Sequence, residues 1–276
     1  MSVIESRKDG NLLTFDEVKH QYRLNGIRVP GPTTFGKGGY PTSEMLIGWM
    51  IGQGSRFTAD QIMKVATTDQ GIGRIEEKWL KEIIKESKTA YRTSSMAAAA
   101  IGTVVHDYAY HTELGHTEEA EKLLALHRPT EAWAKISNGI DKFKEWKGQN
   151  TDEIVATEAI VASVQENYGG KFDRLAYRPG TGLILSDFKT SSGIFVDMFI
   201  QLGAYVKAID EWLGLKVDGV EILRFGKENG EFQTLLITDK SEIEEFIRQA
   251  IFCRRTYSFR LKWESDKRFK WMGRAS

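Results

Sequence analysis

The chain has 276 residues, with 38 basic and 38 acidic side chains and therefore a formal net charge of zero. Hydrophobic residues make up 41% and charged residues 28%, a balance that excludes a disordered or collagen-like chain. A protein coated all over with positive charge is also disfavoured, so any surface for a polyanion must be local. The single cysteine, Cys253, excludes a disulfide framework and any metal site built from several thiolates.

Strand patterns come first along the chain. Alternating apolar residues flank Asn25-Gly26, which is the strongest short signal for a β-hairpin. Residues 30–42 are rich in glycine and proline and are expected to form turns. Helical patterns then cover 43–90 and about 94–115, where Ser94 or Ser95 can provide the N-cap.

In the second half of the chain, the spacing of the apolar residues changes between helical and strand patterns. We expect helices at 131–147, at 195–213 and from Ser241 onward, and strands at 154–164, 171–177, 183–188, 217–225 and 231–238. This order predicts an α/β (α+β) fold, in which helices flank a central mixed β-sheet. The N-terminal hairpin and helical region are an addition to that core.

One glycine-rich segment resembles a phosphate-binding loop. Gly31, Gly36 and Lys37 have the spacing of such a loop, but Gly38 stands where a serine or threonine would bind magnesium. We interpret the segment as a turn and expect no nucleotide cofactor.

Two carboxylates are expected to meet in the hairpin formed by 171–177 and 183–188. A turn centred on Gly180 places Asp173 opposite Asp187 on one face, with Cβ atoms about 5 Å apart. Paired carboxylates repel unless a positive group lies between them, and a divalent cation is the natural occupant. Lys189 points the same way as Asp187, so it can orient a water or hold a phosphate oxygen. The alternative is a salt-bridge pair on an exposed strand.

Further candidate site residues lie outside this hairpin. Gly169-Gly170 suggests a bend or a close backbone approach just before Asp173. The helix expected at 195–213 carries an apolar stripe at helical spacing, formed by Phe195, Phe199, Leu202, Val206, Ile209 and Leu213. Gln201 and Tyr205 share one helix face, beside this stripe rather than in it. His106 is mid-helix, where a buried core histidine is the commoner interpretation of a single residue and a metal ligand the alternative.

Together these pieces resemble the RecB-like branch of the PD-(D/E)XK nucleases. The resemblance covers about residues 94–225, and its specificity comes from the order of the four motifs. They read Gly102…His106, Gly170…Asp173, Asp187-Phe188-Lys189-Thr190 and Gln201…Tyr205. The hairpin followed by Pro32-Thr33-Thr34 also resembles bacteriophage members of the group.

The resemblance implies a restriction-endonuclease-like core and a role for each motif residue. His106, Asp173 and Asp187 would bind the catalytic metal together with the Phe188 carbonyl. Lys189 would position the attacking water or stabilise the transition state. Gln201 and Tyr205 would support the site and touch the DNA backbone, and Lys171 is a further candidate for DNA contact.

Some positions depart from the family pattern or stay open. Tyr110 stands where many members carry an acid, with Asp107 and Glu113 nearby. Glu158 is either an additional site acid or an exposed strand carboxylate. Members with an iron–sulfur cluster use four cysteines, so Cys253 alone selects the branch without the cluster.

The C-terminal part carries a local excess of positive charge. From Arg254 to Arg274 there are eight cations and two acids, interleaved with five aromatic side chains. This composition is typical of nucleic-acid binding, with Arg254, Arg255 and Lys262 as candidate contacts. An amphipathic helix with aromatics in the core and solvated cations is equally compatible.

The sequence thus predicts a Mg²⁺- or Mn²⁺-dependent DNA exonuclease, of the kind used in phage recombination or DNA processing. A structure-specific endonuclease of the same fold and a non-catalytic DNA-binding module are the alternatives. We expect segments 1–92 (hairpin and helical region), 93–250 (nuclease core) and 251–276 (basic-aromatic segment). DNA is the expected partner, a recombinase, a single-strand-binding protein or an oligomer is compatible, and no membrane association is expected. The expected location is the cytoplasm, that of the host if the protein is viral.

Overall fold

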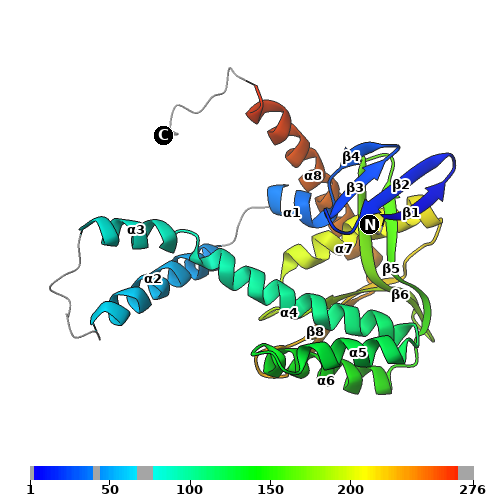
Figure 1. The fold of residues 1–276 in the computed structure, drawn as a ribbon. Helices are drawn as coiled ribbons and strands as arrows, with labels where there is room; N and C mark the ends of the chain where they lie inside the picture. The colour runs from blue at the N-terminus through cyan, green and yellow to red at the C-terminus, as the bar shows by residue number, and fades with distance from the viewer. Residues whose placement is uncertain (1–2, 40–43, 67–76, 267–276) are drawn as a thin grey trace. The chain divides into compact units, whose positions relative to one another are not determined.

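The computed structural model describes residues 3–39, 44–66 and 77–266 (Figure 1). The chain divides into two compact units, one formed by Met1–Tyr40 with Val104–Ser276 and the other by Pro41–Thr103. The N-terminal strands therefore belong to the larger unit, whereas the sequence-based division grouped them with the helices that follow. All the candidate site residues named above also belong to the larger unit.

The N-terminal sheet is antiparallel, in the order β1-β2-β3-β4. Its strands are β1 (Val3–Lys8), β2 (Asn11–Asp16), β3 (Gln21–Leu24) and β4 (Ile27–Val29). The predicted hairpin is confirmed: Asn25 and Gly26 both have positive φ, as the tight turn requires, and they connect β3 to β4.

A short helix follows, where the sequence predicted turns. Helix α1 (Pro32–Gly39) starts on a proline, whose fixed φ suits the first helical position. The amides of Thr34 and Phe35 both donate to the Gly31 carbonyl, and Phe35 is buried. The turn prediction was therefore wrong for 32–39, because tertiary burial of Phe35 outweighs the low helix propensity of the glycines, and its last part, 40–42, lies outside the described residues.

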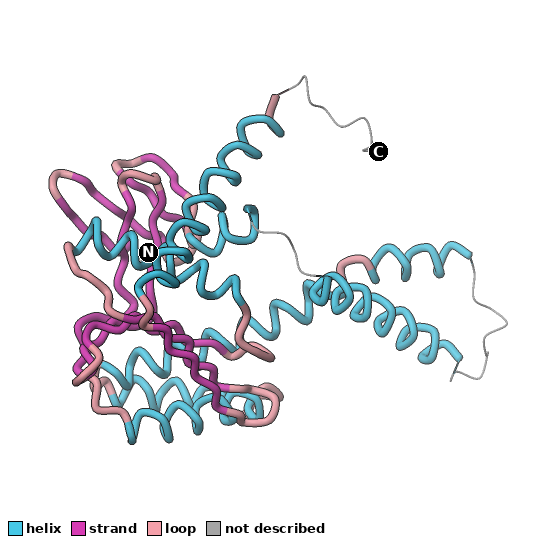
Figure 2. Tube along the Cα trace, turned by 180° about the vertical axis from the view of Figure 1, so that it is seen from behind, coloured by secondary structure: helices cyan, strands magenta, loops and turns pink. Residues whose placement is uncertain are grey.

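The second sheet has five strands in the order β5-β6-β7-β8-β9. Figure 2 shows the strands in magenta and the helices that flank them in cyan. They are β5 (Glu153–Ser163), β6 (Tyr168–Arg178), β7 (Gly182–Lys189), β8 (Gly219–Phe225) and β9 (Phe232–Ile237). β7 and β8 are parallel and joined through α7 (Val196–Leu213), whereas the other neighbours are antiparallel. The predicted α+β class with a central mixed sheet flanked by helices is confirmed.

Most predicted helices exist with shifted ends. They are α4 (Ala90–Glu113), α6 (Trp133–Gln149), α7 and α8 (Lys240–Glu264). α4 begins before Ser94 and Ser95, so neither serine is its N-cap. α5 (Thr117–His127) was not predicted, whereas α8 starts as expected, with the Asp239 carboxylate accepting a hydrogen bond from the Ser241 amide at 2.8 Å.

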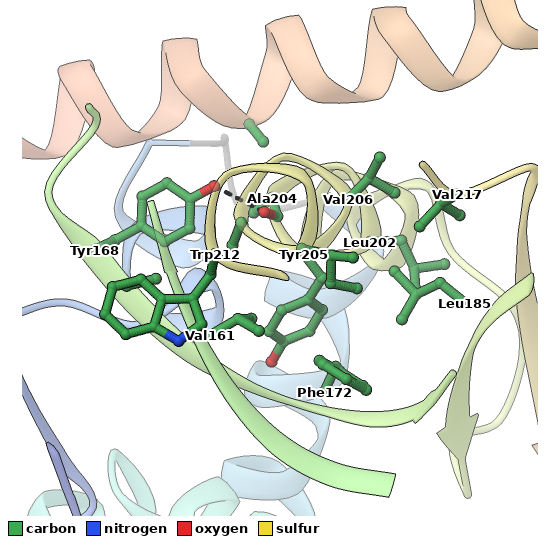
Figure 3. Packing of buried hydrophobic residues seen from close by; sticks show 14 of the residues in the cluster. Val161, Tyr168, Phe172, Leu185, Leu202, Ala204, Tyr205, Val206, Trp212 and Val217 are labelled. Atoms are coloured by element: carbon green, nitrogen blue, oxygen red, sulfur yellow. Dashed lines mark hydrogen bonds between the residues drawn. The ribbon is translucent and has the colours of Figure 1, made fainter. Parts of the chain in front are cut away.

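Two apolar layers enclose the five-stranded sheet. α7 packs on β5 and β6 through four residues of the predicted stripe, Phe199, Leu202, Val206 and Ile209, whereas Phe195 and Leu213 at its ends are exposed. The Tyr168 hydroxyl donates to the Ala204 carbonyl at 2.7 Å (Figure 3). α6 and the C-terminal part of α4 lie on the other side (Figure 1). There Phe143, Phe188 and Phe225 form an aromatic cluster with ring centroids 5.6–5.9 Å apart.

The smaller unit contains α2 (Glu44–Ala66), α3 (Glu77–Ser87) and the beginning of α4. α2 and α3 approach closely at Gly54, where a Cβ atom would lie 2.8 Å from the Ser87 carbonyl oxygen. In the described ranges, no helix combines the length and apolar character that crossing a membrane requires.

Candidate metal centre

The predicted register of the β6–β7 hairpin is confirmed. Every pair in this ladder has the spacing of a turn centred on Gly180, and the last pair is Arg174 with Ser186. The next residue on each strand is Asp173 and Asp187, so the two carboxylates emerge side by side where the ladder ends. This is the arrangement that the sequence predicted for a cation site.

A third acid joins this row from β5. Glu158 lies opposite Asp173, because β5 and β6 keep one register on both sides of it. Its φ of 50° lies in the left-handed region, which costs a residue other than glycine about 1 kcal/mol or more. The Thr157 hydroxyl donates to the Asp173 carbonyl at 2.8 Å and helps to hold this geometry. The Glu158 side chain is 19% exposed, so it is not an exposed strand carboxylate, and its role as a site acid stays a prediction.

His106 reaches the row from α4. Its Nδ1 lies 3.5 Å from Asp173 Oδ2. His106, Glu158 and Asp173 each offer one ligand atom, and these three atoms lie within 4.8 Å of one another. Two carboxylates and an imidazole form a donor set suited to a divalent cation such as Mn²⁺. Asp187, also expected as a ligand, is not in this group of three.

Two lysines form ion pairs with two of these acids. The Lys171 ammonium is paired with Glu158, and the Lys189 ammonium is paired with Asp187. All four side chains are largely buried. A metal cation that binds Glu158 must therefore compete with the Lys171 ammonium. The Lys189 ammonium is paired with Asp187 and does not compete for Glu158.

The electrostatics show that the acids are incompletely compensated. Burial raises the pKa of Glu158 to about 6, and the charge of Asp173 adds to that effect. Burial likewise raises the pKa of Asp187 to about 6, with Lys189 opposing the shift. Burial acts in the same direction on Asp173, but His106 and Lys189 outweigh it and its pKa is lowered. Burial lowers the pKa of His106, but Asp173 outweighs this effect and the pKa is raised. Three acids therefore face two lysines and a readily protonated imidazole, and a cation that binds here takes the place of that proton.

The Phe188 backbone contributes through its amide. The Phe188 N–H donates to Asp173 Oδ2 at 2.7 Å and fixes that carboxylate beside His106. Its side chain belongs to the aromatic cluster below the sheet, with the His106 ring 6.1 Å away. The proposed role of the Phe188 carbonyl as a metal ligand stays a prediction.

Gln201 and Tyr205 meet each other on α7, since Gln201 Nε2 donates to the Tyr205 hydroxyl at 3.3 Å. Tyr205 is only 5% exposed and belongs to the core, which corrects its predicted place beside the apolar stripe. Its ring packs over Gly170, where a Cβ atom would lie 2.6 Å from Tyr205 Cε1. The close approach predicted for the glycine pair is thus confirmed. Tyr205 contacts the strand that carries Asp173 from the buried side of the sheet.

Sequence reasoning missed Tyr22 of the N-terminal sheet. Its ring stacks on Phe15 with centroids 4.5 Å apart. Burial raises the pKa of Tyr22, and the negative charge of Glu158 contributes, which places the hydroxyl in the electrostatic field of the site. The alternation around Asn25-Gly26 identified the strand, but the contact between the two sheets has no local signal.

The three C-terminal residues expected to contact DNA differ in their exposure. Arg254 is only 8% exposed and donates to the Asn167 carbonyl at 2.9 Å, so the prediction of a surface DNA contact is wrong for it. Arg255 is exposed and pairs with Glu166, and Lys262 is also exposed. Residues 267–276 of the basic-aromatic segment lie outside the described residues.

Comparison with protein-family models and with curated protein sequences gives no match. Among solved structures, one similar chain is a "putative exonuclease" from Eubacterium rectale, with 13% identity and a TM-score of 0.42. That alignment covers 83% of this chain and 89% of the other. A second is SSO0001, with 13% identity, a TM-score of 0.27, and coverage of 55% and 73% respectively. At these scores the account of the site depends on its own geometry.

Proposed function

We propose that the protein is a divalent-metal-dependent nuclease that hydrolyses phosphodiester bonds of DNA. The observation that carries the proposal is the His106–Glu158–Asp173 group beside the paired Asp187 and Lys189. Phosphodiester hydrolysis needs a nucleophilic water and compensation of the charge that develops on the phosphate. A bound Mg²⁺ or Mn²⁺ would supply a water of lowered pKa and a charge for the phosphate oxygens.

The residues of this chain then have distinct roles. His106, Glu158 and Asp173 would hold the cation, and Asp187 would complete its surroundings on the neighbouring strand. Lys189 would orient the attacking water or donate to the phosphate as negative charge develops. Lys171, once separated from Glu158, would be free to contact a DNA phosphate.

Tyr205 and Gln201 would support the metal-binding residues without binding the cation themselves. The Tyr205 hydroxyl accepts from Gln201 at 3.3 Å and is buried. The sequence predicted a direct contact between Tyr205 and the DNA backbone, but the side chain is buried and its hydroxyl already accepts a hydrogen bond from Gln201. We therefore propose that Tyr205 positions the strand that carries Asp173 and does not contact DNA.

The finer proposal is an exonuclease that acts in phage recombination or DNA processing, in a cytoplasmic setting. It is supported by the order of the four motifs and by the N-terminal hairpin. The experiment compares linear with covalently closed circular duplex DNA in Mg²⁺ or Mn²⁺. Digestion of the linear form alone supports the exonuclease, whereas cleavage of the circle supports the endonuclease. DNA binding without cleavage in either metal would leave only the non-catalytic module.

A further inference from the structure

The solvent face of α8 carries cations and phenyl rings in alternation. Arg248, Phe252, Arg255, Phe259 and Lys262 follow one another at intervals of four, three, four and three residues. This spacing places all five on one face of the helix, and all five are exposed. We call this set the α8 stripe.

The opposite face of α8 already anchors the helix. Ile243, Ala250 and Cys253 are buried in the core that α8 shares with α7. The two backbones cross closely at Gly203, where a Cβ atom would lie 2.7 Å from the Ile247 amide nitrogen. The phenyl rings of the stripe are thus not needed to attach α8. Phe252 is 59% exposed and Phe259 is 63% exposed, which is unfavourable in water unless a ligand covers them.

The charge on this part of α8 has one sign. No acidic residue occurs between Arg248 and Lys262, whereas the first turns of the helix hold Glu242, Glu244 and Glu245. The stripe therefore presents a positive, aromatic surface that is complementary to a polyanion with flat, apolar faces.

The arginines have acidic neighbours that differ in strength. Arg248 lies 3.6 Å from Glu244, and both side chains are exposed, so this pair contributes about 0–1 kcal/mol and a phosphate can replace the carboxylate at little cost. Arg255 donates two hydrogen bonds to Glu166, whose side chain is only 12% exposed. Glu166 therefore competes with a phosphate at Arg255, although the arginine side chain itself is 71% exposed.

We propose that the α8 stripe binds single-stranded DNA, with phosphates on the cations and bases stacked on Phe252 and Phe259. Unpaired bases offer faces for stacking on aromatic side chains, whereas a duplex hides those faces between neighbouring pairs. α8 packs on α7, which carries Gln201 and Tyr205, so the stripe and the metal centre belong to one unit. The proposal depends on the nuclease function for the identity of the strand as DNA.

The test measures fluorescence anisotropy of a labelled oligo(dT) strand in EDTA, so that no hydrolysis takes place. Phe252→Ala and Phe259→Ala are each expected to weaken binding by roughly fivefold or more. Binding of a duplex of the same length should change less. Leu126→Ala, on an exposed face of α5, is the matched control and should leave affinity unchanged.

Charge variants give a second, independent readout. Arg255→Gln with Lys262→Gln should reduce the slope of log affinity against log salt by about 1.4, since each phosphate contact on a single strand contributes about 0.7. Glu166→Gln releases Arg255 from its partner and should tighten binding of the strand. A merely structural role for Arg255 predicts no such gain.

The inference is overturned if the Phe252→Ala/Phe259→Ala double variant binds oligo(dT) like the wild type. It is also overturned if that variant changes only self-association in sedimentation, because the face would then contact a second copy of the chain. Failure of the nuclease proposal is distinguishable. Strand binding that depends on the stripe, without cleavage in any divalent metal, would support the stripe and reject the enzyme.

Discussion

Two groups of buried charges meet on β6 at consecutive residues, Asp173 and Arg174, and they differ in how the charges are compensated. Arg174 belongs to a network below the sheet, in which its guanidinium lies 3.0 Å from Asp152. Arg178 donates two hydrogen bonds to Asp152 and two to Glu221, all between 2.9 and 3.1 Å. Burial alone would raise the pKa of Asp152, but these partners lower it to about 2.

The metal centre has the opposite property. Glu158 and Asp187 are buried with one lysine each, and burial raises the pKa of both to about 6. Bidentate arginines are absent from the ion pairs that the described residues make at these two acids. Buried carboxylates therefore do not by themselves mark a functional site. Incomplete compensation does, because it leaves room for a further cation.

The largest effect on folding is expected in the compensated network. Arg174→Met removes the buried guanidinium that Asp152 and Glu113 share, and leaves Asp152 with Arg178 and Glu113 with Lys147. Because part of the compensation remains, the free energy of unfolding should fall by about 3 kcal/mol. Urea denaturation measures this change. Arg128→Met removes an exposed pair with Glu121 and should cost less than about 1 kcal/mol, and equal losses in the two variants would refute the distinction.

The largest effect on activity is expected in the incompletely compensated site. Asp187→Asn preserves the shape of the side chain but removes the charge that faces the metal and Lys189. Hydrolysis of linear DNA should fall by about 10²–10³-fold, while the melting temperature stays within a few degrees of the wild type. A variant with full activity would remove Asp187 from the site.

A smaller effect tests the packing that supports the site. Gly170→Ala places a methyl group 2.6 Å from the Tyr205 ring and 3.0 Å from Pro32 Cδ. Overpacking of this kind should destabilise the protein by about 1–3 kcal/mol. Gly148→Ala on α6 meets open space and should be neutral or slightly stabilising, so the difference between the variants isolates the close contact.

The smallest effect is a pH dependence of opposite sign in the two groups. Because the folded pKa of Glu158 and Asp187 is raised, the metal-free protein holds protons more tightly than the unfolded chain, and these acids reduce stability as pH rises from about 4 to 6. Asp152, with a lowered pKa, stabilises the protein above pH 3.8 and loses this contribution toward pH 2. Melting curves in EDTA and in Mn²⁺ measure both, and the stabilisation by Mn²⁺ should grow between pH 5 and pH 7. A stabilisation by Mn²⁺ that is independent of pH would contradict the assignment.

Local patterns in the sequence predicted much of the fold and part of the site. The Asn25-Gly26 turn and the turn around Gly180 determine strand register, so the placement of Asp173 beside Asp187 followed from spacing alone. Glu158 remained open because no turn centre was assigned between the strands expected at 154–164 and 171–177. In the structure the short turn at 164–167 keeps one register from the Ser163–Tyr168 pair to the Ala156–Leu175 pair, and this register places Glu158 opposite Asp173.

The features that could not be predicted from the sequence depend on long-range packing. Tyr22 reaches the site because one sheet docks on another, and periodicity carries no such information. Arg254 looked like a surface cation among others, yet it is buried against the Asn167 carbonyl. Helix α1 forms from a glycine-rich segment because Phe35 gains a place in the core.

The central claim is that His106, Glu158 and Asp173 hold a divalent cation. Calorimetric titration of Mn²⁺ into the wild type and Asp173→Asn at pH 7.5 tests it most directly. We predict binding by the wild type and a loss of at least about tenfold in affinity in the variant, with its fold retained by circular dichroism. No Mn²⁺ binding by the wild type, or equal affinity in both proteins, would contradict the account.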